Sequence, residues 1–325
     1  MNDLHGQAIV IDGLVISKWS RAVFEDMHRG GITAANCTCC VWEGFVDTMH
    51  NISQFKRWIE ENDDILLQVF DAEDIERAKA ENKVGLFLGW QNASGIEDRI
   101  DNLRLFRDLG VRVIQLTYQT QNLVGSGCWE STDLGLSDYG RDVIDELNRL
   151  GILIDLSHVG PQTTHDTIQH SKRPVAYTHC CPKALRDHPR NKTDEELRAI
   201  TDKGGFVGFA TFTPFIKGDD TTVDDCITAL EHVINVVGED SVGIGTDFCQ
   251  DQDAAFFRRN AMDKGVGRLV VKRENDLPPP PQGFERLSDY PNLTGAMEKA
   301  NWQSERIFKV MGGNWLRFLK ESWAA

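Results

Sequence analysis

Short, almost wholly apolar runs alternate along the chain with longer stretches in which apolar residues recur at helical spacing. Runs of this kind are typical of parallel strands that are buried on both faces. Eight runs predict strands: Ala8–Leu14, Ile32–Val41, Val84–Trp90, Val111–Tyr118, Leu153–His158, Val175–His179, Phe206–Thr211 and Val242–Asp247. Helices are predicted between them over Ile52–Asn62, Ala72–Glu81, Arg99–Leu109, Tyr139–Arg149, Thr163–His170, Asp194–Asp202 and Val223–Val237.

This alternation predicts a (β/α)₈ barrel, known as a TIM barrel, occupying residues 1–325 as a single domain. A doubly wound open sheet is the alternative, but no G-x-G-x-x-G motif follows any of the runs. Residues 250–289 are predicted to be irregular, because Pro278–Pro281 cannot form helix interior or sheet ladder. Residues 293–319 predict a C-terminal helical portion that packs on the barrel.

The net charge of the chain limits the kinds of molecule that we expect it to bind. The chain has 35 Lys and Arg against 50 Asp and Glu, a formal net charge of −15. Nucleic acids and anionic membranes need basic patches, so we expect neither as a partner and expect a small-molecule substrate instead. The first residues lack a basic region followed by an apolar stretch, which favours a cytoplasmic location.

The eight cysteines include no C-x-x-C pair, so we expect buried, reduced thiols and not a zinc ribbon or a disulfide framework. Two cysteine alternatives remain open at this point. In the first alternative, Cys180 and His179, which are adjacent in the sequence, form a nucleophilic Cys/His pair. Neighbouring residues on a strand face opposite sides, however, which disfavours this pair. In the second alternative, Cys37 and Cys39, which share one strand face, point into the barrel, where their thiolates would be metal ligands.

Polar residues stand where the predicted strands end, which is where barrel enzymes carry their active sites. These pairs are Gln91-Asn92, Tyr118-Gln119, Ser157-His158, Thr178-His179 and Thr246-Asp247. Two neutral imidazoles and a carboxylate are suitable ligands for a catalytic zinc ion that keeps one position open for water. The spacing therefore predicts a zinc-dependent site at the mouth of the barrel.

Several longer segments carry a family resemblance. They are residues 110–117 (GVRVIQLT), 148–158 (NRLGILIDLSH), 174–179 (PVAYTH) with Arg190 and Asn191 eleven residues later, 243–248 (GIGTDF), 288–293 (SDYPNL) and 312–314 (GGN). Together they span essentially the whole chain, which resembles the renal (membrane) dipeptidase family of the amidohydrolase superfamily. The resemblance implies a barrel with two zinc ions that hydrolyses dipeptides, and a homodimer. It also implies that Asp247 manages protons and that Arg190 binds the substrate carboxylate.

The chain departs from the family pattern at four positions. Leu14 and Ile16 stand where the family has a His-x-Asp pair of zinc ligands, and neither side chain can bind a cation. Gln91 replaces a bridging glutamate, and Tyr118 replaces a substrate-contacting histidine. By this correspondence the first metal site is lost, whereas the second keeps His158 and His179, with Gln91 as a weaker ligand.

Three functions are compatible with these residues. The first, which we favour, is a hydrolase with one zinc ion held by His158, His179 and Gln91, acting on a small dipeptide or amide. Arg190, Asn191 and Tyr118 would bind that substrate through its free carboxylate, and Asp247 would be the catalytic residue. The second is a metal-free enzyme that uses Asp247, Tyr118 or a cysteine as its acid–base group. The third is a non-catalytic descendant that binds a small carboxylate through Arg190.

Overall fold

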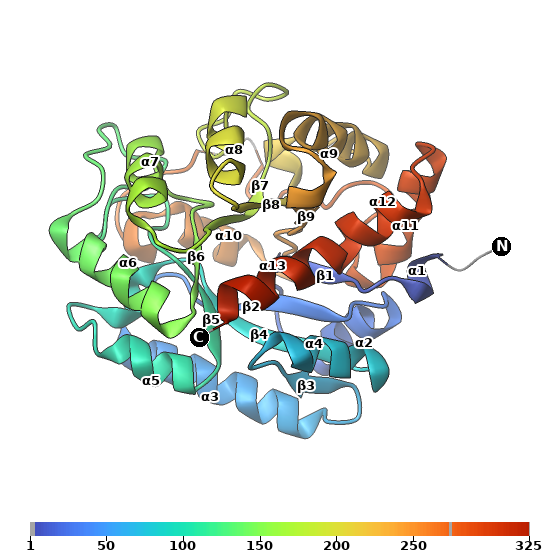
Figure 1. Ribbon diagram of the computed structural model, residues 1–325, viewed down its shortest axis with the longest axis horizontal. Coiled ribbons are helices and arrows are strands. Elements are labelled where there is room, and N and C mark those ends of the chain that lie inside the picture. The colour runs from blue at the N-terminus through green and yellow to red at the C-terminus, as the bar shows by residue number, and fades with distance from the viewer. Residues whose placement is uncertain (1–3, 273–274, 325) are drawn as a thin grey trace.

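The computed structural model describes residues 4–272 and 275–324, and its strands form one closed parallel barrel (Figure 1). Eight strands form the ring, and β2 pairs with β4 to close it. The ring strands are β1 (Ile11–Val15), β2 (Ala34–Cys40), β4 (Val84–Trp90), β5 (Val111–Gln115), β6 (Leu153–Asp155), β7 (Ala176–Cys180), β8 (Phe206–Phe209) and β9 (Val242–Ile244). The predicted (β/α)₈ barrel is therefore confirmed, and the open sheet is wrong.

Helices cover the outside of the barrel (Figure 1). They are α1 (Leu4–Gln7), α2 (Arg21–Arg29), α3 (Phe45–Glu61), α4 (Ala72–Ala80), α5 (Asn102–Asp108), α6 (Asp138–Leu150), α7 (Pro161–His170), α8 (Asp194–Thr201), α9 (Val223–Val237), α10 (Ala254–Ala261), α11 (Tyr290–Lys299), α12 (Ser304–Phe308) and α13 (Asn314–Trp323). All seven predicted helices are present, with ends that differ by a few residues. None of the helices in the described part of the chain is both long and apolar enough to cross a membrane.

Besides the four-residue helix α1 and the short 3₁₀ turns, three elements were not predicted. The helix α2 follows the capping residue Ser20 and buries Val23, Phe24 and Met27, so its helical pattern is present in the sequence. The helix α10 lies inside residues 250–289, which were wrongly expected to be irregular throughout. The third element, β3 (Leu66–Gln68), is too short to show a pattern and pairs with the start of β4, outside the ring.

One end of the barrel is closed by α13, which lies across the strands in Figure 1. Trp315 is buried there and donates a hydrogen bond from Nε1 to the carbonyl of Ile244 at 2.7 Å. A Cβ atom at Gly13 or Gly243 would lie 2.6 or 2.5 Å from the Trp315 ring, so these strand glycines make room for the indole. Because α13 covers the ends at which the strands begin, the opposite end is left for a site.

Candidate active site at the carboxyl ends of the strands

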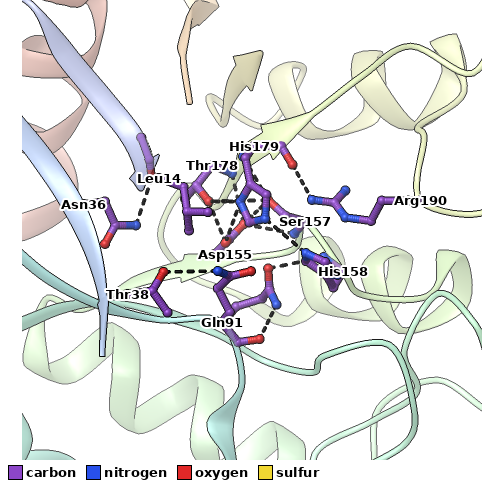
Figure 2. Close-up of polar contacts among 12 residues, drawn as sticks. Leu14, Asn36, Thr38, Gln91, Asp155, Ser157, His158, Thr178, His179 and Arg190 are labelled. Carbon is purple, nitrogen blue, oxygen red and sulfur yellow. Dashed lines mark hydrogen bonds and ion pairs between the residues drawn. The ribbon is translucent and has the colours of Figure 1, made fainter. Parts of the chain in front are cut away.

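His158 and His179 meet at the open end of the barrel. His158 follows β6, His179 lies in β7, and both imidazoles are buried. Their Nε2 atoms face one another at 3.1 Å (Figure 2). The two residues come from neighbouring parallel strands, so the convergence expected from strand-end positions is what the structure has.

Hydrogen bonds fix which nitrogen of each ring carries the proton. The Thr178 hydroxyl donates to Asp155 Oδ2 at 2.6 Å, so its oxygen accepts from His179 Nδ1 at 2.8 Å. His158 Nδ1 donates to Gln119 Oε1 at 3.3 Å. The Nδ1 atom of each ring thus has an acceptor. The two Nε2 atoms lie within hydrogen-bonding distance of each other, and a metal ion bound there would take the lone pairs of both. Metal-ligating histidines are held by acceptors on their other nitrogen in the same way.

The buried carboxylate of Asp155 accepts hydrogen bonds from the residues next to both histidines, Ser157 and Thr178, an arrangement that we call a carboxylate clamp. Its Oδ1 accepts hydrogen bonds from the Ser157 N–H at 2.9 Å, the Ser157 hydroxyl at 2.5 Å and the Thr178 N–H at 3.0 Å. Burial raises the pKa of Asp155, while these hydrogen bonds act to lower it. Burial, with the charges of Arg190 and Lys192, holds the pKa of His179 well below its usual value, which keeps the ring neutral.

Asp247 is positioned by a second clamp of the same design. The carboxylate of Asp12 accepts from the Leu14 N–H at 3.1 Å, the Thr246 N–H at 2.8 Å, the Thr246 hydroxyl at 2.6 Å and the Tyr290 hydroxyl at 2.8 Å. Burial raises the pKa of Asp12 from 3.8 to about 6. Asp247 follows Thr246 with φ at +59°, a left-handed conformation that side chains other than glycine seldom adopt.

Arg190 brings a positive charge into the same region. Its side chain is buried and lies with Cζ 5.4 Å from the Phe215 ring centroid. Nη2 donates to the His179 carbonyl (Figure 2), whereas Nε and Nη1 have no hydrogen-bond partner among the described residues. Two unpaired donor nitrogens on a buried guanidinium are costly unless a ligand binds them, and a carboxylate is a suitable acceptor for a guanidinium.

The neighbouring part of the mouth, at β1, β2 and β5, is apolar. Leu14 and Ile16 are buried, and Ile16 packs in one cluster with Val41 and Tyr118. The Tyr118 ring stacks on His158 with centroids 4.3 Å apart. Neither Leu14 nor Ile16 offers a donor atom, so the residues present do not fit a metal ion on this side.

Gln91 lies between the polar part of the mouth, which holds the two histidines, and the apolar part, which holds Leu14 and Ile16. Its Nε2 donates to Thr38 Oγ1 at 3.1 Å, which leaves Oε1 on the other branch of the amide (Figure 2). Thr38 and Asn36 point into the barrel, where Asn36 donates to the Gly13 carbonyl at 2.9 Å. Because side chains alternate along a strand, Cys37 and Cys39 face the helices. They do not replace the missing ligands.

Five of the seven predicted site residues line a single cavity of about 40 Å³, and the other two are His179 and Asn191. Gln91, Tyr118, His158, Arg190 and Asp247 line it, and His179 faces His158 behind it. Asn191 does not line the cavity. Its amide donates to the carbonyls of Arg186 and Phe215 at 3.0 and 2.8 Å and so ties the loop that carries Arg190.

The donor set fits one metal ion better than two. His158 and His179 offer two imidazole nitrogens 3.1 Å apart, and Gln91 and Asp247 line the same cavity as His158. Over residues 4–272 and 275–324, no group of three or more His, Cys, Asp or Glu side chains is arranged to hold a metal ion. Catalytic zinc sites generally use three protein ligands, so this site would bind its metal more weakly than they do.

The cysteines are not suited to act as nucleophiles in this site. All eight are free thiols, and six of them are buried. Burial raises the pKa of the Cys180 thiol to about 12, so it stays protonated at neutral pH. Its neighbour His179 points into the barrel, whereas Cys180 packs in the core, and the two do not form a nucleophilic pair.

Sequence reasoning missed the residues that hold the site in place. Asp12, Asp155 and Gln119 were given no role, although Asp155 lies in the segment 148–158 and Gln119 follows Tyr118 at a strand end. One signal was available for the two aspartates, because each lies inside a predicted apolar strand, where an unpaired carboxylate is costly. Gln119, like Asp247, has a positive φ of 59°, which the sequence does not reveal.

A closed (β/α)₈ barrel with this mouth is an amidohydrolase-type fold. The sequence profile of the membrane dipeptidase family (Peptidase family M19) matches residues 18–256. The chain belongs to this family of hydrolases, and the family resemblance inferred from the motifs is confirmed.

Three relatives give the range of similarity. An uncharacterized dipeptidase of Schizosaccharomyces pombe is 32% identical over 285 residues, which are 85% of this chain and 62% of that protein. This chain thus spans about three fifths of the length of that relative. The crystal structure of an amidohydrolase from Pseudomonas aeruginosa is 48% identical, with a TM-score of 0.97 over 99% of this chain and 98% of the other.

The third relative shares the fold alone. A metallo peptidase from Rhodobacter sphaeroides, liganded with a phosphinate mimic of the dipeptide L-Ala-D-Ala, is 21% identical with a TM-score of 0.80. The match covers 97% of this chain and all of that one (100%).

Proposed function

We propose that this protein is a dipeptidase-like hydrolase that cleaves a small dipeptide or amide bearing a free carboxylate, with one metal ion held by His158 and His179. The observation that carries the proposal is the buried Arg190, whose Nε and Nη1 lack partners among the described residues while the side chain lines the same cavity as His158 and Asp247. Family membership supports the hydrolytic chemistry. Zinc is one of the metals that imidazole ligands suit, and catalytic zinc sites commonly use histidines.

Each side chain has a definite task in this reaction. Arg190 binds the substrate carboxylate through its guanidinium and orients the scissile bond toward the histidine pair. When bound, the metal ion would polarise the scissile carbonyl and lower the pKa of a water molecule. Asp247 accepts a proton from the nucleophile and returns it to the leaving amine. Tyr118 stacks on His158 and keeps that ring in its orientation.

A binding protein without catalysis is the second candidate. It is favoured by the absence, within the described residues, of a third metal-ligating side chain grouped with the histidine pair. In that case Arg190 would hold a small carboxylate and no bond would be cleaved.

The test is an amino-acid release assay on the untagged protein supplied with zinc. The substrates are dipeptides, N-acyl amino acids and the matching dipeptide amides, which lack the free carboxylate. We expect kcat/KM for substrates with a carboxylate to exceed that for the matching amides by about a hundredfold, and loss of turnover in Asp247→Asn. Absence of turnover, together with carboxylate binding that Arg190→Met abolishes, would favour the binding protein instead.

A further inference from the structure

A second and larger cavity adjoins the active-site cavity. It has a volume of about 330 Å³ and lies between the segments that follow β8 and β9 and residues 277–281, here called the proline strap. Phe212, Asp247, Cys249 and Phe257 line both cavities, so the two share a wall. A ligand group in the larger cavity would therefore lie next to Asp247.

The neutral polar side chains of the larger cavity are bonded to the protein itself. Thr213 donates to the Pro279 carbonyl at 2.8 Å, and this bond fixes the proline strap. Thr246 donates to Asp12, and Thr211 donates to the Thr246 carbonyl at 3.2 Å. The amides of Gln250 and Gln252 donate to Asp26 at 2.6 Å and to the Ile16 carbonyl at 3.0 Å.

The surface left for a ligand is therefore mainly apolar. It is formed by Phe212, Phe248, Phe257, Leu277 and the four prolines Pro278–Pro281. At about 30 Å³ per water molecule, 330 Å³ corresponds to about eleven waters, and so to a side chain of on the order of ten non-hydrogen atoms. Proline and phenylalanine side chains present flat apolar faces, which suit an aromatic ring.

Charge excludes an acidic ligand group from this cavity. Three carboxylates line it, those of Asp247, Asp251 and Glu285, against the single guanidinium of Arg286. Arg286 is already engaged, at 2.8 Å from Asp26 and 3.5 Å from Asp251. An anionic side chain would thus meet net negative charge in a partly dehydrated pocket.

We propose that the larger cavity is a specificity pocket for a bulky, uncharged and preferably aromatic side chain, carried by the residue on the amino-terminal side of the scissile bond. The assignment rests on the proposed function, because Arg190 at the carboxylate end places the other half of the substrate beside Asp247. The proline strap and the three phenylalanines set the preference, and the carboxylates reject Asp and Glu at that position.

The test uses phenethylamine, which carries the aromatic ring and an ammonium but neither a carboxylate nor a cleavable bond. Its binding to the untagged protein is measured by calorimetry against ethylamine. Leu277→Trp fills the cavity from the strap, and Leu134→Trp is the matched control on a leucine that is 73% exposed elsewhere. We expect phenethylamine to bind at least about tenfold more tightly than ethylamine, and Leu277→Trp to remove that advantage while Leu134→Trp keeps it.

Equal binding of the two amines, or an advantage that survives in Leu277→Trp, overturns the proposal. Because neither amine needs Arg190 or turnover, a failure of the hydrolase proposal leaves this binding result intact. In the hydrolase, kcat/KM for Phe-Gly should exceed that for Glu-Gly by at least about tenfold, and the reverse order would also overturn the proposal.

Discussion

Two carboxylate clamps hold the mouth of the barrel, and they differ in what they present. Asp155 and Asp12 each accept the N–H two residues further along the chain and both the N–H and the hydroxyl of a threonine near the end of the neighbouring strand. The Asp155 clamp places His158 and His179 in contact. The Asp12 clamp places Asp247 beside Leu14, whose side chain has no donor atom.

The two clamps share the hydrogen bonds that hold the fold and differ in the side chains that could take part in a reaction. In both clamps the same pattern of hydrogen bonds satisfies a buried carboxylate and fixes the residue after the threonine, His179 in one and Asp247 in the other. Whether a clamp supports metal binding then depends on the side chains placed beside it. The Asp12 clamp keeps its geometry although the neighbouring positions are apolar, so it acts as a structural element and as a positioning device for Asp247.

The largest contrast between the two clamps is expected from removing a histidine. His179→Ala takes one of two nitrogens from the metal, so activity should fall by on the order of a thousandfold. Ile16→Val, at the apolar part of the mouth, is the control and should keep nearly full activity. Steady-state kinetics with a dipeptide checks both variants, and equal losses in the two would mean that the histidine pair has no special role.

Arg190→Met should have the next largest effect. Removal of one partner from a buried charge pair costs about 2–5 kcal/mol, which lowers kcat/KM on the order of a hundredfold or more for substrates with a carboxylate. Dipeptide amides should lose almost nothing, since they have no carboxylate for Arg190 to bind. A similar loss for both substrate types would show that Arg190 acts by holding the fold and not the substrate.

Matched clamp variants test the comparison directly. Asp155→Asn removes the charge that fixes the Thr178 and His179 orientation, so zinc affinity should fall about 10–100-fold. Asp12→Asn makes the same chemical change where no metal ligand is attached and should leave zinc affinity within about twofold. Titration with zinc measures both, and equal effects would contradict the division of roles between the clamps.

The protonation of Asp12 should change activity less than any of these substitutions does. It should change the free energy of unfolding instead. The pKa of Asp12 is raised from 3.8 to about 6, so the folded state binds the proton more strongly than the unfolded state does. Asp12 therefore destabilises the protein progressively as pH rises from about 4 to about 6, by about 3 kcal/mol in total, and by a constant amount above that. The unfolding free energy of the wild type minus that of Asp12→Asn should fall across this window. A flat difference would contradict the assignment.

The barrel could be predicted from the sequence because its strands are apolar over their whole length and its helices show a separate, helical spacing. The same reasoning placed His158, His179 and Asp247 at strand ends, where a closed ring must bring them together. It could not find Gln119 as the partner of His158 Nδ1, nor the unpaired nitrogens of Arg190, because these depend on contacts between segments far apart in the chain. It assigned Asn191 to substrate, whereas the amide holds the Arg190 loop.

The most direct measurement is the metal content of untagged protein purified without chelators, before and after incubation with zinc. We predict about one zinc ion per chain, lost in both His158→Ala and His179→Ala and retained in Ile16→Val. Two ions per chain would mean that the apolar part of the mouth also binds metal. No bound metal even with excess zinc would contradict the assignment of His158 and His179 as metal ligands.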